Sequence, residues 1–163
     1  MAIFDDLKVR SIAELLKLHA AVNEELRNRN VLRTANSPTG DLAEYLFCQA
    51  FGWKQYPNSE RSFDATDESG VRYQIKGRRI HIRNKSRQLS AIRDLAGFDF
   101  IAAVLFDDYY RVTKAALIPA SVAHTRSKYV ERTNSHKFML RDDVWQDAGV
   151  VDVTHRLLAV ENR

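Results

Sequence analysis

Residues 63 to 79 read FDATDESGVRYQIKGRR, and the rest of the chain is arranged around this stretch. The run Asp67-Glu68-Ser69-Gly70 is typical of a turn, and residues 71 to 77 after it alternate between apolar and polar side chains as a β-strand does. Alternation puts polar side chains on one face, namely Arg72, Gln74, Lys76 and Arg78, and apolar ones on the other, namely Val71, Tyr73 and Ile75. The stretch therefore predicts a hairpin whose second strand has a polar face and a dry face.

Asp64 stands just before the turn, on the first arm of this hairpin. If the two arms pair, Asp64 falls opposite or diagonal to Gln74, and Lys76 lies one strand pitch further on. A carboxylate oxygen, an amide oxygen and the backbone carbonyl of Ile75 are suitable ligands for a hard divalent cation. We expect a cation site here, with a lysine beside it, and this set is suited to attack on a phosphodiester.

The order Asp64, then Gln74-Ile75-Lys76, preceded by Glu44 in Gly40-Asp41-Leu42-Ala43-Glu44, resembles the PD-(D/E)xK nuclease superfamily, which includes many restriction endonucleases. The resemblance covers residues 37 to 118. It has two departures: Phe63 stands where a proline is usual, and Gln74 stands where a second acid is usual. The second departure removes one negative charge from the expected metal site.

The resemblance implies an α/β fold with a restriction endonuclease-like core, in which a mixed β-sheet is flanked by helices. It also implies a metal-dependent DNA endonuclease that hydrolyses phosphodiester bonds with Mg²⁺, or with Mn²⁺ in its place, and leaves a 5′-phosphate. In that scheme Asp64, Gln74 and the Ile75 carbonyl hold the metal, and Glu44 holds it directly or through water. Lys76 orients the attacking water or offsets charge on the phosphorane.

Two other functions stay open on the same fold. One is a structure-specific nuclease of the repair or resolvase kind, and the other is a catalytically inactive DNA-binding module, which the neutral Gln74 favours. Two unrelated classes are excluded. The chain is not a P-loop protein, because no glycine-rich loop precedes a Lys-Ser or Lys-Thr pair, and it is not a serine-triad hydrolase of the Gly-x-Ser-x-Gly type, because no such elbow occurs.

Positive charge is concentrated after the turn. The chain has a net charge of +4, which is weak evidence for a nucleic-acid partner, yet residues 69 to 93 hold eight Lys or Arg and no Asp or Glu. A block of one sign that begins inside the expected active site is typical of a phosphate-binding track. The DNA-binding residues predicted from it are Arg78, Arg79, Arg83, Lys85 and Arg87.

Length and composition fit one ordinary domain. With 163 residues, 45% hydrophobic and 28% charged, we expect a single nuclease domain over 1–163, without a membrane span. The single Cys48 cannot form an internal disulfide, and the five histidines show no zinc-ligand spacing. With no secretion signal at the N-terminus, these features favour the cytoplasm.

Two helices are expected before the hairpin. Ser11-Ile12-Ala13-Glu14 is a capping box, so residues 1–30 predict a helical extension that precedes a catalytic core over 37–118. Its apolar stripe, which includes a buried or half-buried His19, should dock on the protein's own core, or else on a second copy to form a homodimer. Ser37, Pro38 and Gly52 bracket the second helix, which carries Glu44 and in which Asp41 should complement the helix dipole.

The remaining elements follow from apolar runs and turn residues. Residues 80–92 predict the end of a strand and a short helix, 98–106 predict the central buried strand, and 110–118 a strand returning beside it. A short helix should start at Pro119, and a final helix at Asp152. Residues 133–137 predict a polar loop.

Overall fold

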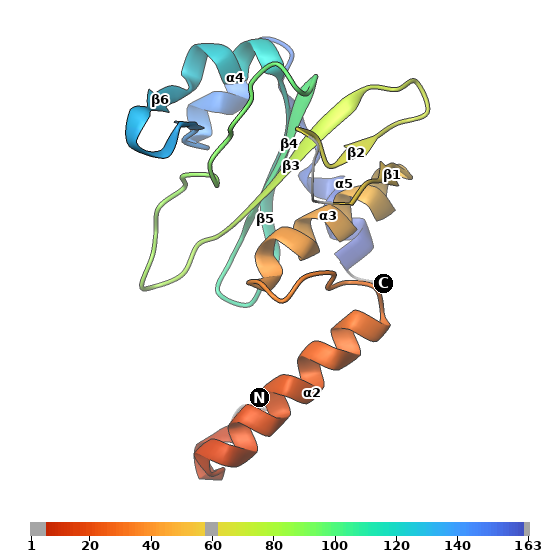
Figure 1. Ribbon diagram of the computed structural model, residues 1–163, viewed down its shortest axis with the longest axis vertical. Coiled ribbons are helices and arrows are strands. Elements are labelled where there is room, and N and C mark those ends of the chain that lie inside the picture. Colours follow the sequence, from red (N-terminus) through yellow and green to blue (C-terminus); the bar gives the residue numbers. More distant parts are fainter. Residues whose placement is uncertain (1–5, 58–61, 162–163) are drawn as a thin grey trace.

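The protein, described by a computed structural model over residues 6–57 and 62–161, has a mixed α/β fold (Figure 1). Six strands form one sheet in the order β1-β2-β3-β4-β5-β8. Their bounds are β1 Lys54–Gln55, β2 Ala65–Thr66, β3 Arg72–Arg79, β4 Phe100–Phe106, β5 Val112–Pro119 and β8 Val151–Asp152. The sheet is mixed, because β3 and β4 pair in parallel while the other neighbouring strands pair antiparallel.

The central strand is the one that the sequence predicts. β4 reads FIAAVLF, and six of its seven residues are buried. A continuous apolar run is typical of a strand covered on both faces. The expected return strand is β5, and the short helix after Pro119 is α4 (Ala120–Arg126).

Helices cover both faces of the sheet. On one side α3 (Pro38–Phe51) and α5 (Thr154–Glu161) pack over the dry face of β3, where Tyr73 and Ile75 are buried. On the other side α4 packs with the segments around Leu89, Phe138 and Val144. The alternation expected for β3 is therefore confirmed, since Gln74 and Lys76 point away from the α3 layer and are only partly buried.

α3 lies unusually close to β3 at Gly77. A Cβ atom placed on Gly77 would lie 2.8 Å from the Thr39 carbonyl oxygen and 2.9 Å from the Ala43 Cβ. Any larger residue would collide with the helix, so glycine at this position sets the distance between the two elements.

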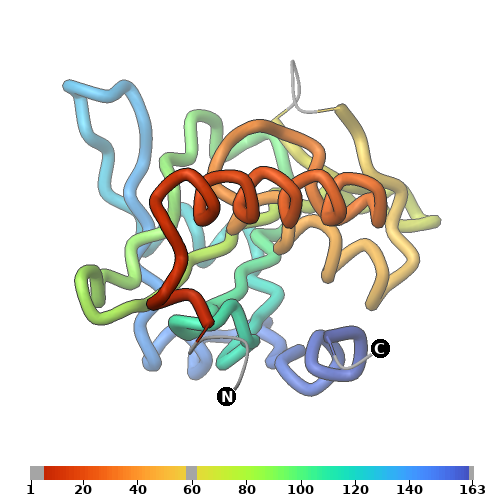
Figure 2. The backbone as a smooth tube through the Cα atoms, turned by 90° about the horizontal axis from the view of Figure 1, so that it is seen from below, coloured from red at the N-terminus to blue at the C-terminus, as the bar shows by residue number. Residues whose placement is uncertain are grey.

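The predicted N-terminal helix exists, but it does not dock on the core. α2 (Ile12–Asn28) follows a short 3₁₀ turn, η1 (Asp6–Val9), and has the full capping box at Ser11 and Glu14. None of its residues is buried, and Ile12 is 79% and Leu16 64% exposed. In Figure 1 it projects below the sheet, and Figure 2 shows it from below, crossing in front of the body. The expectation of a buried His19 is wrong, because this side chain is exposed.

Two further expectations need correction. Residues 80–92 contain no helix and form an irregular segment with isolated bridges, because the Leu89 and Ile92 amides donate to the Phe138 and His136 carbonyls and not to a helical turn. The polar loop expected at 133–137 contains a strand: β6 (Lys128–Val130), η2 (Glu131–Thr133) and β7 (Ser135–Lys137) form a small hairpin. The chain continues through η3 (Asp142–Gln146). Within the described ranges, no helix has the length and apolar character needed to cross a bilayer.

Candidate active site

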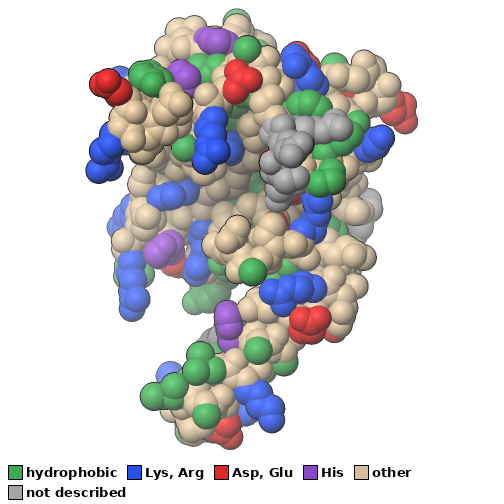
Figure 3. Space-filling model, in the orientation of Figure 1, with side chains coloured by type: hydrophobic (Ala, Val, Ile, Leu, Met, Phe, Trp, Pro, Cys, Tyr) green, Lys and Arg blue, Asp and Glu red, His purple; other side chains and the backbone are tan. Residues whose placement is uncertain are grey.

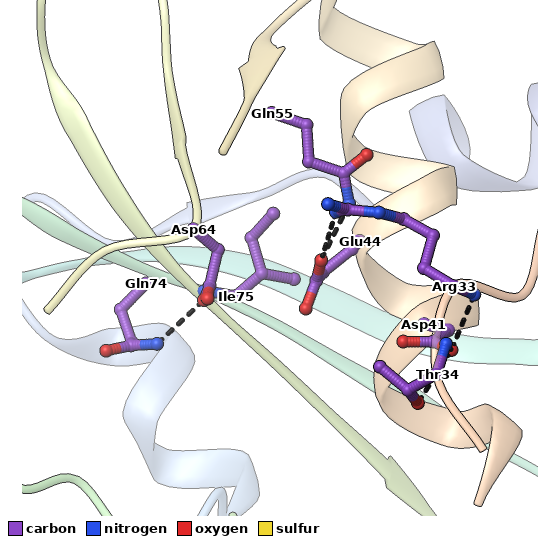
Figure 4. A network of polar contacts seen from close by, with 8 residues as sticks. All are labelled: Arg33, Thr34, Asp41, Glu44, Gln55, Asp64, Gln74 and Ile75. Atoms are coloured by element: carbon purple, nitrogen blue, oxygen red, sulfur yellow. Dashed lines mark hydrogen bonds and ion pairs between the residues drawn. The ribbon is translucent and has the colours of Figure 1, made fainter. Parts of the chain in front are cut away.

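Asp64 lies opposite Gln74, as the hairpin pattern predicts. β2 and β3 pair with Ala65 facing Tyr73, and the Asp64 amide donates to the Tyr73 carbonyl over 2.8 Å. The Asp64 Oδ2 accepts two further hydrogen bonds, from the Ile75 amide at 2.6 Å and from the Gln74 Nε2 at 2.7 Å. The carboxylate is thus fixed just before β2 begins, against Gln74 and Ile75 of β3 (Figure 4).

Glu44 approaches this carboxylate from α3. Glu44 is buried, with 8% of the residue exposed. Its Oε2 accepts hydrogen bonds from the Gln55 Nε2 at 2.6 Å and from the Arg33 Nη1 at 3.3 Å. Burial and the negative charge of Asp64 raise the pKa of Glu44 to about 7, although the contacts with Gln55 and Arg33 oppose this shift. Figure 4 shows Glu44 and Asp64 on either side of Ile75.

Lys76 completes the group from the strand itself. Burial lowers the pKa of its ammonium group, while the charges of Asp64 and Glu44 act in the opposite direction. Burial likewise raises the pKa of Asp64, against its hydrogen bond from Ile75 and the charge of Lys76. The Lys76 Nζ donates to the Ala91 carbonyl at 3.4 Å. Two carboxylates and one lysine, from α3, the segment before β2 and β3, therefore interact electrostatically in a partly buried site.

Two contacts to Glu44 are not anticipated by the sequence. Arg33 lies in the connection between α2 and α3, and Gln55 lies on the two-residue strand β1. Neither segment carries a sequence motif that would predict a contact with Glu44. The one available signal is a nearby apolar residue that becomes buried: Leu32 directly precedes Arg33, and Trp53 stands two residues before Gln55. Burial of those anchors brings the two polar groups to the helix.

Asp41 lies in the first turn of α3, as expected, and it also binds the loop before this helix. It is 4% exposed, and its Oδ2 accepts from the backbone amides of Arg33 and Thr34 at 2.8 Å each and from the Thr34 hydroxyl at 3.0 Å. A buried carboxylate needs such donors, and they outweigh an interaction with the helix dipole alone. Asp41 thereby holds the loop from which Arg33 reaches Glu44 (Figure 4).

The predicted DNA-binding residues follow the site along β3 and the segment after it. Arg78 donates to the Ser86 carbonyl at 2.9 Å, and Arg79 donates to the Asp108 carbonyl at 2.7 Å and lies over the Tyr110 ring. These acceptors are neutral backbone carbonyls, so they do not compensate the positive charge of either arginine. Arg87 forms an ion pair with Asp142 at 3.0 Å, which reduces its charge for a ligand. Arg83 and Lys85 are exposed.

The oxygen atoms around this site are of the type that a hard divalent cation binds, but the site holds fewer negative charges than one with an acid at position 74 would. Asp64 and Glu44 carry carboxylate oxygens, and the Ile75 carbonyl carries a neutral one. Gln74 turns its Nε2 toward Asp64, so its oxygen would face a shared cation only after the amide group rotates. In the ranges 6–57 and 62–161, no three His, Cys, Asp or Glu side chains gather in a group that could hold a metal, so a cation here would depend on the amide and the carbonyl. The sequence matches no model of a known protein family and no curated protein sequence.

Proposed function

We propose that this protein is a Mg²⁺-dependent DNA endonuclease with a restriction endonuclease-like core. The observation that carries the proposal is the convergence of Glu44, Asp64 and Lys76, each with a pKa shifted by burial toward its neutral form. Burying two acids beside one base costs stability, and such groups concentrate at functional sites. The exposed Arg83 and Lys85 on the segment after β3 support a polyanionic substrate.

In this proposal Asp64, Gln74 and the Ile75 carbonyl hold the cation, with Glu44 binding it directly or through water. The bound cation would lower the pKa of a water molecule and neutralise charge that develops on the phosphate. Lys76 would orient that water or stabilise the phosphorane through its positive charge, and the charges of Asp64 and Glu44 favour that charged form. Gln55 and Arg33 would orient Glu44.

One observation favours the inactive DNA-binding alternative. The Gln74 amide donates to Asp64, and together with the Ile75 amide it satisfies the Asp64 Oδ2 without a cation. Gln74→Glu separates the two possibilities, because a carboxylate adds charge to a true metal ligand and should tighten Mg²⁺ binding in calorimetry. Identical isotherms would mean that Gln74 does not ligate the metal.

The direct test is incubation with supercoiled, linear and branched DNA and either Mg²⁺ or Mn²⁺, followed by mapping of the cleaved ends. Asp64→Ala and Lys76→Ala should each reduce the cleavage rate by at least about 100-fold while DNA binding survives. Glu24→Ala, on the exposed α2, is the control and should cleave normally. Cleavage restricted to branched DNA would favour the repair or resolvase alternative, and full activity in EDTA would contradict the metal-dependent reaction.

A further inference from the structure

The small hairpin β6–β7 places like charges directly against each other. Lys128 and Lys137 are Cα partners in its antiparallel register, so their side chains project from the same face. Both are exposed, and neither has an acidic partner among the residues that the structure describes. A cross-strand pair of like charges destabilises a hairpin, and it does so most in a hairpin of three-residue strands.

Further cations surround this pair. A hollow of about 240 Å³ is lined by Arg126, Lys128, Lys137, Met139 and Arg141. Arg126 is compensated, because it forms ion pairs with Asp143 and Asp147. Arg141 is exposed and has no acidic partner within 6–57 and 62–161. Three uncompensated cations thus converge on one hollow, where an anion would relieve their repulsion.

The hairpin is continuous with the candidate active site. Residues 87–92 run antiparallel to residues 136–140, with backbone hydrogen bonds from Leu140 to Arg87 at 3.0 Å and from His136 to Ile92 at 2.7 Å. The same segment carries the Ala91 carbonyl that accepts from Lys76. The segment 87–92 therefore hydrogen-bonds both to β7 of the hairpin and to Lys76.

Charge along the chain agrees with this geometry. Residues 69–93 and 126–141 together hold thirteen of the 25 Lys and Arg residues but only one of the 21 acids, Glu131. In Figure 3 the blue Lys and Arg side chains gather along the left of the view, the side that carries β6 in Figure 1. A polyanion with regularly spaced charges matches such a surface better than a single small anion does.

We propose that Lys128, Lys137 and Arg141 bind the phosphate backbone of duplex DNA, beside the strand that carries Lys76. The identity of the ligand as DNA rests on the proposed function, whereas binding by these three residues can be tested separately from cleavage. The hairpin adds phosphate contacts on a different element from the arginines of residues 78–87. Its like-charge pair is then retained for the ligand and not for the fold.

The experiment measures binding of a fluorescent 25-base-pair duplex in EDTA, so that no cleavage occurs, across a series of KCl concentrations. Lys128→Gln/Lys137→Gln should weaken binding about 10-fold near 0.1 M salt and reduce the slope of log K against log salt by roughly 1 to 2 units. Lys128→Arg/Lys137→Arg should retain both. Lys17→Gln/Arg29→Gln removes the same charge from the exposed α2 and its C-cap, and should leave the slope unchanged.

Urea unfolding of the glutamine pair provides the structural control, and its stability should equal or exceed that of the wild type because repulsion is removed. An unchanged salt slope, an equal effect of the α2 control, loss of binding in the arginine pair, or no duplex binding by the wild type would each overturn the proposal. Cleavage is scored separately. Duplex binding that depends on the hairpin, without cleavage in Mg²⁺, would retain this surface and reject the nuclease.

Discussion

Two helices of similar length, α2 and α3, have opposite relations to the rest of the protein. α2 has the better local signals, with a complete capping box and 17 residues, and none of its residues is buried. α3 has no side-chain hydrogen bond at its N-cap, yet it buries five residues, including Phe47 and Glu44. Capping tells where a helix begins, whereas its place in the fold depends on a complementary surface. α3 has that surface because Gly77 lets it approach β3.

The largest expected effect is on the docked helix. Phe47 is fully buried and stacks on Trp53 with ring centroids 5.8 Å apart. Phe47→Ala should lower the free energy of unfolding by about 3 to 5 kcal/mol, because it removes apolar contacts and leaves a cavity. Urea denaturation followed by tryptophan fluorescence measures it. A loss below about 1 kcal/mol would mean that α3 is not anchored to the sheet by this ring.

Gly77→Ala tests the approach of α3 to β3. The added methyl group would meet the Thr39 carbonyl and Ala43, so we expect a loss of about 1 to 3 kcal/mol in unfolding free energy. Gly40→Ala is the matched control on α3, where an added Cβ has no neighbour within 4 Å. The control should be neutral or slightly stabilising. Equal effects of the two substitutions would contradict the close contact.

Glu44→Gln should stabilise the protein while it removes a group proposed to act in cleavage. The pKa of Glu44 is raised from 4.5 to about 7, so the folded state loses stability as pH rises through that window and the carboxylate ionises. In metal-free buffer at pH 8 we expect a gain of about 1 to 3 kcal/mol, shrinking toward zero at pH 4. Glu24→Gln on α2 should show no such pH dependence, and a pH-independent gain in Glu44→Gln would contradict the titration.

The smallest effect is expected on α2. Leu16 is 64% exposed, and Leu16→Ala should change the unfolding free energy by less than about 0.5 kcal/mol. Denaturation at several protein concentrations measures it. A larger loss that grows with protein concentration would show that a second copy covers α2 in solution. In that case α2, like α3, would bury an apolar face.

The parts of the molecule that the sequence predicts best are those in which one local pattern meets one constraint. Alternation from Arg72 to Arg78 works because only one face of β3 is covered by α3, and the run FIAAVLF works because β4 is covered on both sides. The opposition of Asp64 and Gln74 follows from a short turn that fixes the register.

The rest depends on surfaces that no local pattern describes. Arg33 and Gln55 reach Glu44 because Leu32 and Trp53 are buried nearby. These contacts depend on how distant segments pack together, which a local sequence pattern does not contain. His19 lies in an apolar stripe typical of a docked helix, but no residue of α2 is buried in the structure. The strands β6 and β7 have three residues each and a polar sequence, too little for a period-2 signal.

The parallel pairing of β3 with β4 has a consequence for how the chain folds. The hairpins β2–β3 and β4–β5 close across short turns, whereas the parallel pair must first close the segment 80–99, and such non-local pairing is slow. Until it forms, FIAAVLF presents an unpaired strand edge with no charge and no proline, which is the signature of an aggregation-prone segment. We expect refolding yield to fall as protein concentration rises, and the surroundings of Lys76 to be completed in the last step of folding.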